Sequence, residues 1–258
     1  MEFPNHLTEC NNFWKTLKET WKEWIATACI ALGTVAISKT IYPQQRVIFY
    51  DNYNIRYPYT GETISTPLVS IFIIIIPFFT LILLATIFPK KINLCYAALG
   101  MTQTLCLTLI VTEALKVTVA RPRPNYFSYC GYDNITQTCQ GKPSHRRDAL
   151  LSFPSGHSSN SFSSATFLTL LMSFTFRNPE IWWILVKFLP VLSALFVSAT
   201  RIIDHMHHVS DVVAGAILGI GVACMIFLSQ YQRIFMANRL LDGDELPLDP
   251  TDEIVVSK

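Results

Sequence analysis

Three short segments of the 258-residue chain combine imidazoles, cations and carboxylates in patterns that suit phosphate chemistry. In the segment nearest the carboxyl terminus, His207 and Asp211 are four residues apart, so on a helix they lie one turn apart on one face. A carboxylate there can accept the proton-bearing nitrogen of His207, fix its tautomer and leave the other nitrogen free to attack. Arg201 adds a fork of donors for phosphate oxygens. These residues predict a histidine nucleophile beside a phosphate clamp.

The middle segment, Ser152-Phe-Pro-Ser-Gly-His157, stands where a long helix is expected to begin. The amino terminus of a helix presents unpaired N–H groups and binds anions. Gly156 allows close backbone approach, and Ser155 can donate its hydroxyl. His157 titrates near neutral pH and can give a proton to a leaving group. A lone histidine at a helix start is more often a cap or a surface residue, so this role depends on the neighbouring segments.

The first segment, from Lys116 to Pro124, carries three cations, Lys116, Arg121 and Arg123. Its prolines disfavour helical geometry before them, so the preceding apolar helix is expected to stop at this segment. Guanidinium and ammonium groups gathered at one mouth suit phosphate oxygens. Taken alone, they could equally mark the edge of a membrane.

A metal site is the alternative use of the polar residues around position 207. Possible ligands are Asp204, His205, His207, His208 and Asp211. Their spacing does not match known zinc patterns, and the cysteines lie elsewhere in the chain. We therefore expect no metal and no cofactor, with arginine, lysine and backbone dipoles supplying the positive charge.

Long apolar runs must position these segments. Hydrophobic residues make up 51% of the chain and charged residues 15%, and the apolar residues fall into runs long enough to cross a bilayer. We expect an all-α fold, a bundle of six transmembrane helices near 25–42, 67–88, 93–115, 158–176, 181–200 and 209–229. With six spans, the third and fifth connections emerge on one side, so the site would form at the ends of the third, fourth and sixth helices. Glu113 and Lys116 are expected to form an i,i+3 ion pair.

The three segments together resemble the signature motifs of the lipid phosphate phosphatase (type 2 phosphatidate phosphatase) superfamily. The motifs are Lys116-x6-Arg123-Pro124, Pro154-Ser155-Gly156-His157 and Arg201-x5-His207-x3-Asp211. The resemblance covers roughly residues 25–229 and is closest to eukaryotic lipid phosphate phosphatases and diacylglycerol pyrophosphate phosphatases. One departure is Thr200, where the family usually has serine, but the hydroxyl is retained.

The resemblance implies roles for individual residues. His207 would be the nucleophile that forms a phosphohistidine, Asp211 its orienting partner, and His157 the acid that protonates the leaving lipid alcohol. The phosphoryl group would be held by Lys116, Arg123, Ser155, Gly156, His157 and Arg201. Magnesium would not be needed. The implied substrates are phosphatidic acid, lysophosphatidic acid, diacylglycerol pyrophosphate and sphingoid phosphates. A lipid phosphotransferase and a catalytically silent membrane scaffold or transporter are the alternatives.

The resemblance also implies that both termini are cytoplasmic and that the site is luminal or extracellular, in the plasma membrane or an endomembrane. Basic residues lie on both sides, so their count alone is indecisive. Asn134-Ile135-Thr136 is a glycosylation sequon, usable only in a lumen. Cys130 and Cys139 could form a disulfide there, or remain free thiols.

Three regions are expected along the chain. Residues 1–24 form a cytoplasmic amino-terminal segment, either a helix in the headgroup layer or a solvated helix continuous with the first span. Residues 25–229 form the six-span phosphatase domain, and residues 230–258 form an acidic, mostly disordered tail. No basic face with interleaved aromatics is present, so the expected partners are the bilayer and its lipids, not nucleic acid. The sequence leaves a homo-oligomer open.

Overall fold

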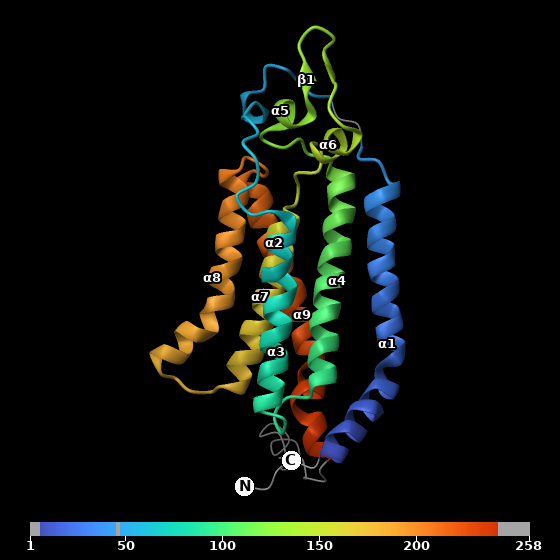
Figure 1. The fold of residues 1–258 in the computed structure, drawn as a ribbon, viewed down its shortest axis with the longest axis vertical. Helices are drawn as coiled ribbons and strands as arrows, with labels where there is room; N and C mark the ends of the chain where they lie inside the picture. The colour runs from blue at the N-terminus through green and yellow to red at the C-terminus, as the bar shows by residue number, and fades with distance from the viewer. Residues whose placement is uncertain (1–5, 45–46, 242–258) are drawn as a thin grey trace, which may run out of the picture.

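The computed structural model describes residues 6–44 and 47–241, which form an elongated helical bundle with a cap of short elements at one end (Figure 1). The bundle consists of α1 (His6–Thr40), α2 (Thr66–Ser70), the π-helical turn η2 (Ile71–Ile75), α3 (Ile76–Ile87), α4 (Leu94–Val119), α7 (Gly156–Thr175), α8 (Ile181–Ile203) and α9 (Val209–Leu241). The cap contains η1 (Tyr53–Ile55), α5 (Tyr126–Cys130), β1 (Tyr132–Asp133), β2 (Thr138–Cys139) and α6 (Pro143–Asp148). Strands β1 and β2 pair antiparallel, with Tyr132 opposite Cys139.

Four helices in the described part of the chain are long and apolar enough to cross a membrane. They are Pro67–Ile87, Leu94–Val119, Ile181–Ile203 and Val209–Phe235. The predicted first and fourth spans are also helical, as parts of α1 and α7, but they fall outside this set. Serines crowd the first half of α7, and charged residues crowd the first half of α1. The membrane-bound helical class is therefore established, whereas the count of six spans stays a prediction.

Helix α7 lies against α4, α8 and α9, so most of its serines are buried by protein. The closest approach is to α9. A Cβ added to Gly219 would lie 2.2 Å from the Ser159 carbonyl oxygen, and one added to Gly215 would lie 2.6 Å from the Ser155 oxygen. Small residues spaced four apart let helix backbones approach closely in membrane bundles. Ser158 adds a hydrogen bond from its hydroxyl to the Val212 carbonyl (2.8 Å). This packing fixes the amino terminus of α7 against that of α9.

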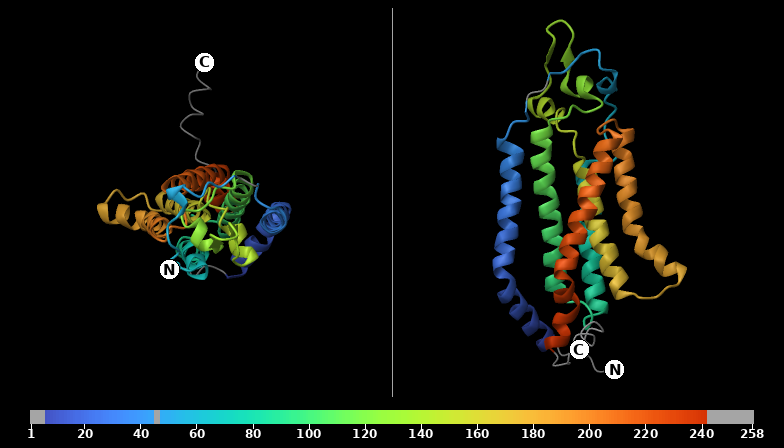
Figure 2. Two further views of the ribbon diagram at one scale, coloured as in Figure 1. Left: turned by 90° about the horizontal axis from the view of Figure 1, so that it is seen from above. Right: turned by 180° about the vertical axis from the view of Figure 1, so that it is seen from behind.

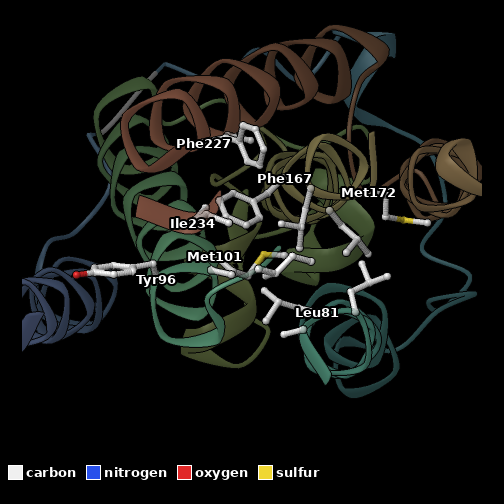
Figure 3. Close-up of a cluster of buried hydrophobic side chains, with 14 residues drawn as sticks. Leu81, Tyr96, Met101, Phe167, Met172, Phe227 and Ile234 are labelled. Atoms are coloured by element: carbon white, nitrogen blue, oxygen red, sulfur yellow. The ribbon is translucent and has the colours of Figure 1, made fainter. Parts of the chain in front are cut away.

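The end of the bundle opposite the cap is filled by a buried apolar cluster (Figure 3). Phe167 and Phe227 meet edge to face with ring centroids 5.4 Å apart, which joins α7 to α9. Met101 from α4 and Leu81 from α3 complete the cluster from the other side. The cluster holds four helices together at a level remote from the cap.

Helix α1 runs without interruption from His6 to Thr40, so the amino-terminal segment is continuous with the first predicted span. Seen from above, α1 and α8 lie on opposite sides of the bundle (Figure 2). A polar contact anchors α1 to α9, where Arg233 donates to Glu23 at 2.8 Å. The tail predicted from residue 230 begins inside a helix, because α9 continues to Leu241. Residues 242–258 of that predicted tail lie outside the described residues.

Candidate active site

The three sequence segments meet at the cap end of the bundle, where α4 and α8 end and α7 and α9 begin (Figure 1). Backbone hydrogen bonds tie them together directly. The Ser155 N–H donates to the Asp211 carbonyl (3.0 Å), and the Ser152 N–H donates to the Arg121 carbonyl (3.0 Å). The ring nitrogen Nε2 of His208 lies 3.2 Å from the Pro122 carbonyl oxygen. Residues up to about ninety positions apart therefore share one mouth.

His207 is buried just before α9, and its orientation is fixed by a backbone group. Its Nδ1 lies 2.7 Å from the Ser152 carbonyl oxygen. A carbonyl can only accept, so the proton of the neutral ring lies on Nδ1 and the lone pair on Nε2. This tautomer is the one that a nucleophilic imidazole requires.

The hydrogen bond expected between His207 and Asp211 does not form, although the two side chains lie close together. The nearest distance from His207 Nδ1 to Asp211 Oδ2 is 4.0 Å, which is too long for a hydrogen bond. The helical one-turn rule does not hold because α9 begins at Val209, so His207 lies outside the helix. The orienting acceptor is a main-chain carbonyl, and no side-chain pattern could have identified it.

Asp211 is fully buried and organises the loops around His207. It accepts from Arg121 Nη1 (2.6 Å), the Ser152 hydroxyl (2.6 Å) and the His208 backbone N–H (2.9 Å). Because the Ser152 carbonyl contacts His207, Ser152 links Asp211 to the imidazole. Arg121, one of the three cations of the first segment, therefore forms an ion pair with Asp211.

His157 is the second residue of α7, and its Nε2 is buried with no hydrogen-bond partner among the described residues. Burial, followed by the nearby positive charges of Arg201, Lys116 and Arg123, lowers the pKa of His157 to about 3. Burial and Arg123 likewise lower the pKa of His207 well below its ordinary value. In the unliganded protein both rings are therefore neutral near pH 7, beside a concentration of positive charge.

Lys116 lies in the last turn of α4, which continues to Val119, and not in the connection where the predicted span ended. It forms the expected ion pair with Glu113 at 2.6 Å. Its ammonium also lies against the start of α7, because a Cβ added to Gly156 would be only 3.0 Å from Lys116 Nζ. Ser155 caps α7 by accepting from the Ser158 N–H (3.4 Å). The Lys116 ammonium and the N–H groups at the start of α7 therefore lie close enough to bind the same anion.

Arg123 and Arg201 add two further positive charges near His157. Arg123 donates from Nε to the Asp148 carbonyl (2.8 Å) and contacts the sulfur of Met206 through Nη1 (3.5 Å). Both arginines lower the pKa of His157, which places their charges close to that ring. The positive charges of Arg123, Arg201 and Lys116 therefore all act on His157.

Arg201 is fully buried and heavily supported. It donates from Nη2 to the Ile64 carbonyl (2.8 Å) and to Asp204 (3.0 Å), and from Nη1 to Glu62 (3.4 Å). The Thr200 hydroxyl oxygen accepts from the same guanidinium at 3.3 Å. The hydroxyl retained at position 200 therefore has a defined contact.

Glu62 is a site residue that the sequence did not indicate. It lies in the connection between α1 and α2, which approaches the site because the Thr63 N–H donates to Asp204 at 2.9 Å. A single acidic residue in an irregular segment carries no spacing relation to the motifs. Only the folded chain reveals that it shares Arg201 with Asp204.

The cap covers this mouth and contains a disulfide between Cys130 and Cys139. The bridge spans the β1–β2 hairpin, and Asn134 lies exposed in its turn. Within the described residues, no group of three or more histidine, cysteine, aspartate or glutamate side chains is arranged to hold a metal ion. The site combines the lone pair of His207, the buried imidazole of His157, three cations and the amino terminus of α7. Together these groups suit transfer of a phosphoryl group.

Comparison with known proteins agrees with this chemistry. The model of the PAP2 superfamily matches residues 97–235, which include all three segments. Probable lipid phosphate phosphatase 4 of Arabidopsis thaliana is 30% identical over 83% of this chain and 74% of its own length. Diacylglycerol pyrophosphate phosphatase 1 of Saccharomyces cerevisiae is 27% identical over 81% of this chain and 76% of its own, and phospholipid phosphatase 2 of Mus musculus is 29% identical over 71% and 75%. No solved structure matches the chain.

Proposed function

The chain belongs to the PAP2 superfamily, and from that premise we propose that it is a membrane-embedded lipid phosphate phosphohydrolase working through a phosphohistidine. Its substrates would be phosphatidic acid, lysophosphatidic acid, diacylglycerol pyrophosphate or sphingoid phosphates. The relatives named as lipid phosphate and diacylglycerol pyrophosphate phosphatases support this class of substrate. The observation that carries the proposal is the 2.7 Å contact from His207 Nδ1 to the Ser152 carbonyl, which leaves Nε2 able to attack. The nearby cations can supply the positive charge that a metal ion would otherwise provide, so we expect the reaction to need no magnesium.

In the first step, the lone pair on His207 Nε2 forms a bond to phosphorus while the bond from phosphorus to the lipid oxygen breaks. The leaving alkoxide takes a proton from His157, and the lipid alcohol departs. Lys116, Arg123 and Arg201 stabilise the negative charge on the equatorial phosphoryl oxygens. The N–H groups at the start of α7 add donors that are oriented before the reaction begins.

In the second step, water attacks phosphorus and the bond to His207 Nε2 breaks. His157, now neutral, accepts the proton of the water as it attacks, so the ring returns to its starting state. Inorganic phosphate leaves, and His207 recovers its lone pair. Protons and bonds balance over the two steps with water as the only co-substrate.

The proton on His157 must come with the substrate, because its pKa of about 3 makes it neutral in the empty site. The cations that lower this pKa are those that a bound phosphate would neutralise, so binding raises the proton affinity of His157. A phosphate monoester has a second pKa of about 6 and can itself carry the proton into the site. We therefore expect binding of an inorganic phosphate or vanadate anion to be coupled to proton uptake.

We further propose that the cap and the site face a lumen or the cell exterior. The exposed Asn134 sequon and the Cys130–Cys139 bridge support this placement, because glycans and stable disulfides belong to oxidising compartments. The start of α1 and the end of α9 lie at the opposite end of the bundle, and this end would then be cytoplasmic (Figure 2).

The test is phosphate release from phosphatidic acid by the detergent-solubilised, purified chain. The His207→Ala variant should lose activity by roughly 10³-fold or more, as loss of a nucleophile does in other covalent enzymes. The matched control is His145→Ala, since His145 lies in the cap, stacked on Tyr129 and outside the motifs. Activity should resist a chelator and be inhibited by vanadate. Full activity in His207→Ala would refute the nucleophile assignment.

A further inference from the structure

An apolar cavity of about 370 Å³ lies between α3, α7 and α8 on the membrane-facing side of the bundle. Ile76 of α3 and Leu189 of α8 line its outer edge and are 45% and 57% exposed, so the cavity reaches the lipid-facing surface. Its inner end borders the apolar cluster of Figure 3, since Met172 belongs to both. The volume has room for roughly a dozen groups the size of a water, each about 30 Å³.

Helical spacing joins this cavity to the catalytic residues. On α7, the lining residues Ser161, Ala165, Leu168 and Met172 follow His157 at helical intervals and share its face. On α8, Ala194 lines the cavity and Arg201 lies two turns further toward the cap on the same face. The cavity therefore lies directly below the general acid and one phosphate clamp.

Ser161 is the polar residue of the cavity wall that follows His157 most closely along α7, and its hydroxyl lacks a partner among the described residues. The residue is 4% exposed and Oγ has no hydrogen-bond partner in the described part of the chain. Its neighbours on α7 are all satisfied, by hydroxyl bonds from Ser158, Ser159, Ser163 and Ser164 to main-chain carbonyls. A buried hydroxyl without a partner costs about 1–3 kcal/mol, and such groups usually have a ligand or water.

We propose that this cavity binds the first part of a substrate acyl chain and that Ser161 donates a hydrogen bond to the ester carbonyl of that chain. The inference rests on the proposed function, because His157 marks the side on which the lipid alcohol leaves. Ser161 lies one turn below His157, a rise of about 6 Å along α7. In a glycerolipid the carbonyl of the neighbouring ester lies four bonds from the leaving oxygen, roughly 5 Å away. The lipid-facing opening lets the rest of the chain continue into the bilayer.

The first experiment compares a diester phosphatidic acid with its dialkyl ether analogue, which lacks the carbonyl. In Ser161→Ala, kcat/KM for the ester should fall about 5- to 10-fold, the value of one neutral hydrogen bond. The same substitution should leave kcat/KM for the ether unchanged. Equal effects on both substrates, or no effect on either, would overturn the carbonyl contact.

The second experiment fills the cavity. Ser193 lines it from α8, whereas the adjacent Leu192 does not line it and is 46% exposed, so Leu192→Phe is the matched control. Ser193→Phe should lower kcat/KM for dioleoyl phosphatidic acid about tenfold relative to the dibutyryl lipid, while Leu192→Phe leaves the ratio unchanged. An unchanged ratio in Ser193→Phe would show a packing gap or a site for bulk lipid, and would refute the inference. If the wild-type chain releases phosphate from neither lipid, the proposed function fails, and the inference fails with it.

Discussion

Gly156 provides a substitution that should separate activity from stability. It is the first residue of α7, directly after the Ser155 cap. A Cβ at this position would lie 3.0 Å from Lys116 Nζ, 3.6 Å from Lys116 Cε and 3.7 Å from Thr112 Cγ2. The nearest atom is the end of a flexible side chain, so Gly156→Ala should displace the ammonium by a few tenths of an ångström and leave the backbone in place.

The two expected effects differ in size and sign. Alanine is favoured over glycine by up to about 1 kcal/mol within a helix, so the free energy of unfolding should change little or rise slightly. A charge-assisted hydrogen bond to phosphate contributes about 1.5–3 kcal/mol, and misplacing Lys116 removes much of it. At about 1.4 kcal/mol per tenfold, kcat/KM should fall roughly 10- to 100-fold.

The assay pairs kcat/KM on phosphatidic acid micelles with the thermal midpoint in the same detergent. In a Lys116→Ala background, Gly156→Ala should cause almost no further loss of activity, because the two changes remove one interaction. Gly219→Ala is the contrasting variant, since its Cβ would lie 2.2 Å from the Ser159 carbonyl oxygen, and backbone cannot yield. Gly219→Ala should prevent folding or lower the thermal midpoint strongly. A Gly156→Ala variant that is destabilised like Gly219→Ala, or that loses activity additively with Lys116→Ala, would refute this reasoning.

The buried carboxylate, the second histidine and the sequon each give a further expectation. Asp211→Asn removes the ionic partner of Arg121 and should lower stability by about 1–3 kcal/mol together with kcat/KM; unchanged stability with lost activity would instead indicate a direct role on His207. The pKa of His157 is lower folded than unfolded, so the unfolded chain binds more protons below about pH 6.5 and stability falls on acidification. His157→Gln should therefore show a smaller decrease in thermal midpoint between about pH 7 and about pH 5 than the wild type; equal decreases would contradict the low pKa. Glycosidase treatment should increase the gel mobility of the wild type and not of Asn134→Gln, and no change in the wild type would contradict the luminal placement.

The predictions drawn from local spacing agree with the structure where the chain is helical. The start of α7 at Gly156, capped by Ser155, agrees with the helix start expected from the Ser152–His157 segment. The Glu113–Lys116 pair forms because both residues lie on α4. Where a residue falls outside a helix, spacing misleads: His207 precedes α9, so its i,i+4 relation to Asp211 produces no hydrogen bond.

The sequence alone indicates which reactive side chains the protein carries and which reaction they suit. The types and order of Lys116, Arg123, His157, Arg201 and His207 indicate phosphoryl transfer, because few other reactions need two imidazoles among several cations. The apolar runs indicate the membrane, because no soluble core needs runs of that length. Both conclusions depend on side-chain chemistry and local periodicity, which a linear chain displays directly.

Which groups touch was decided only by the tertiary structure. The Ser152 carbonyl that fixes the His207 tautomer is a main-chain atom, present in every residue and therefore invisible to any reading of side chains. The Glu62 contact with Arg201 joins positions 139 residues apart, and the cavity below His157 exists only between packed helices. Such contacts arise from the close approach of α7 and α9 and the return of the cap loops, which depend on packing across the whole bundle.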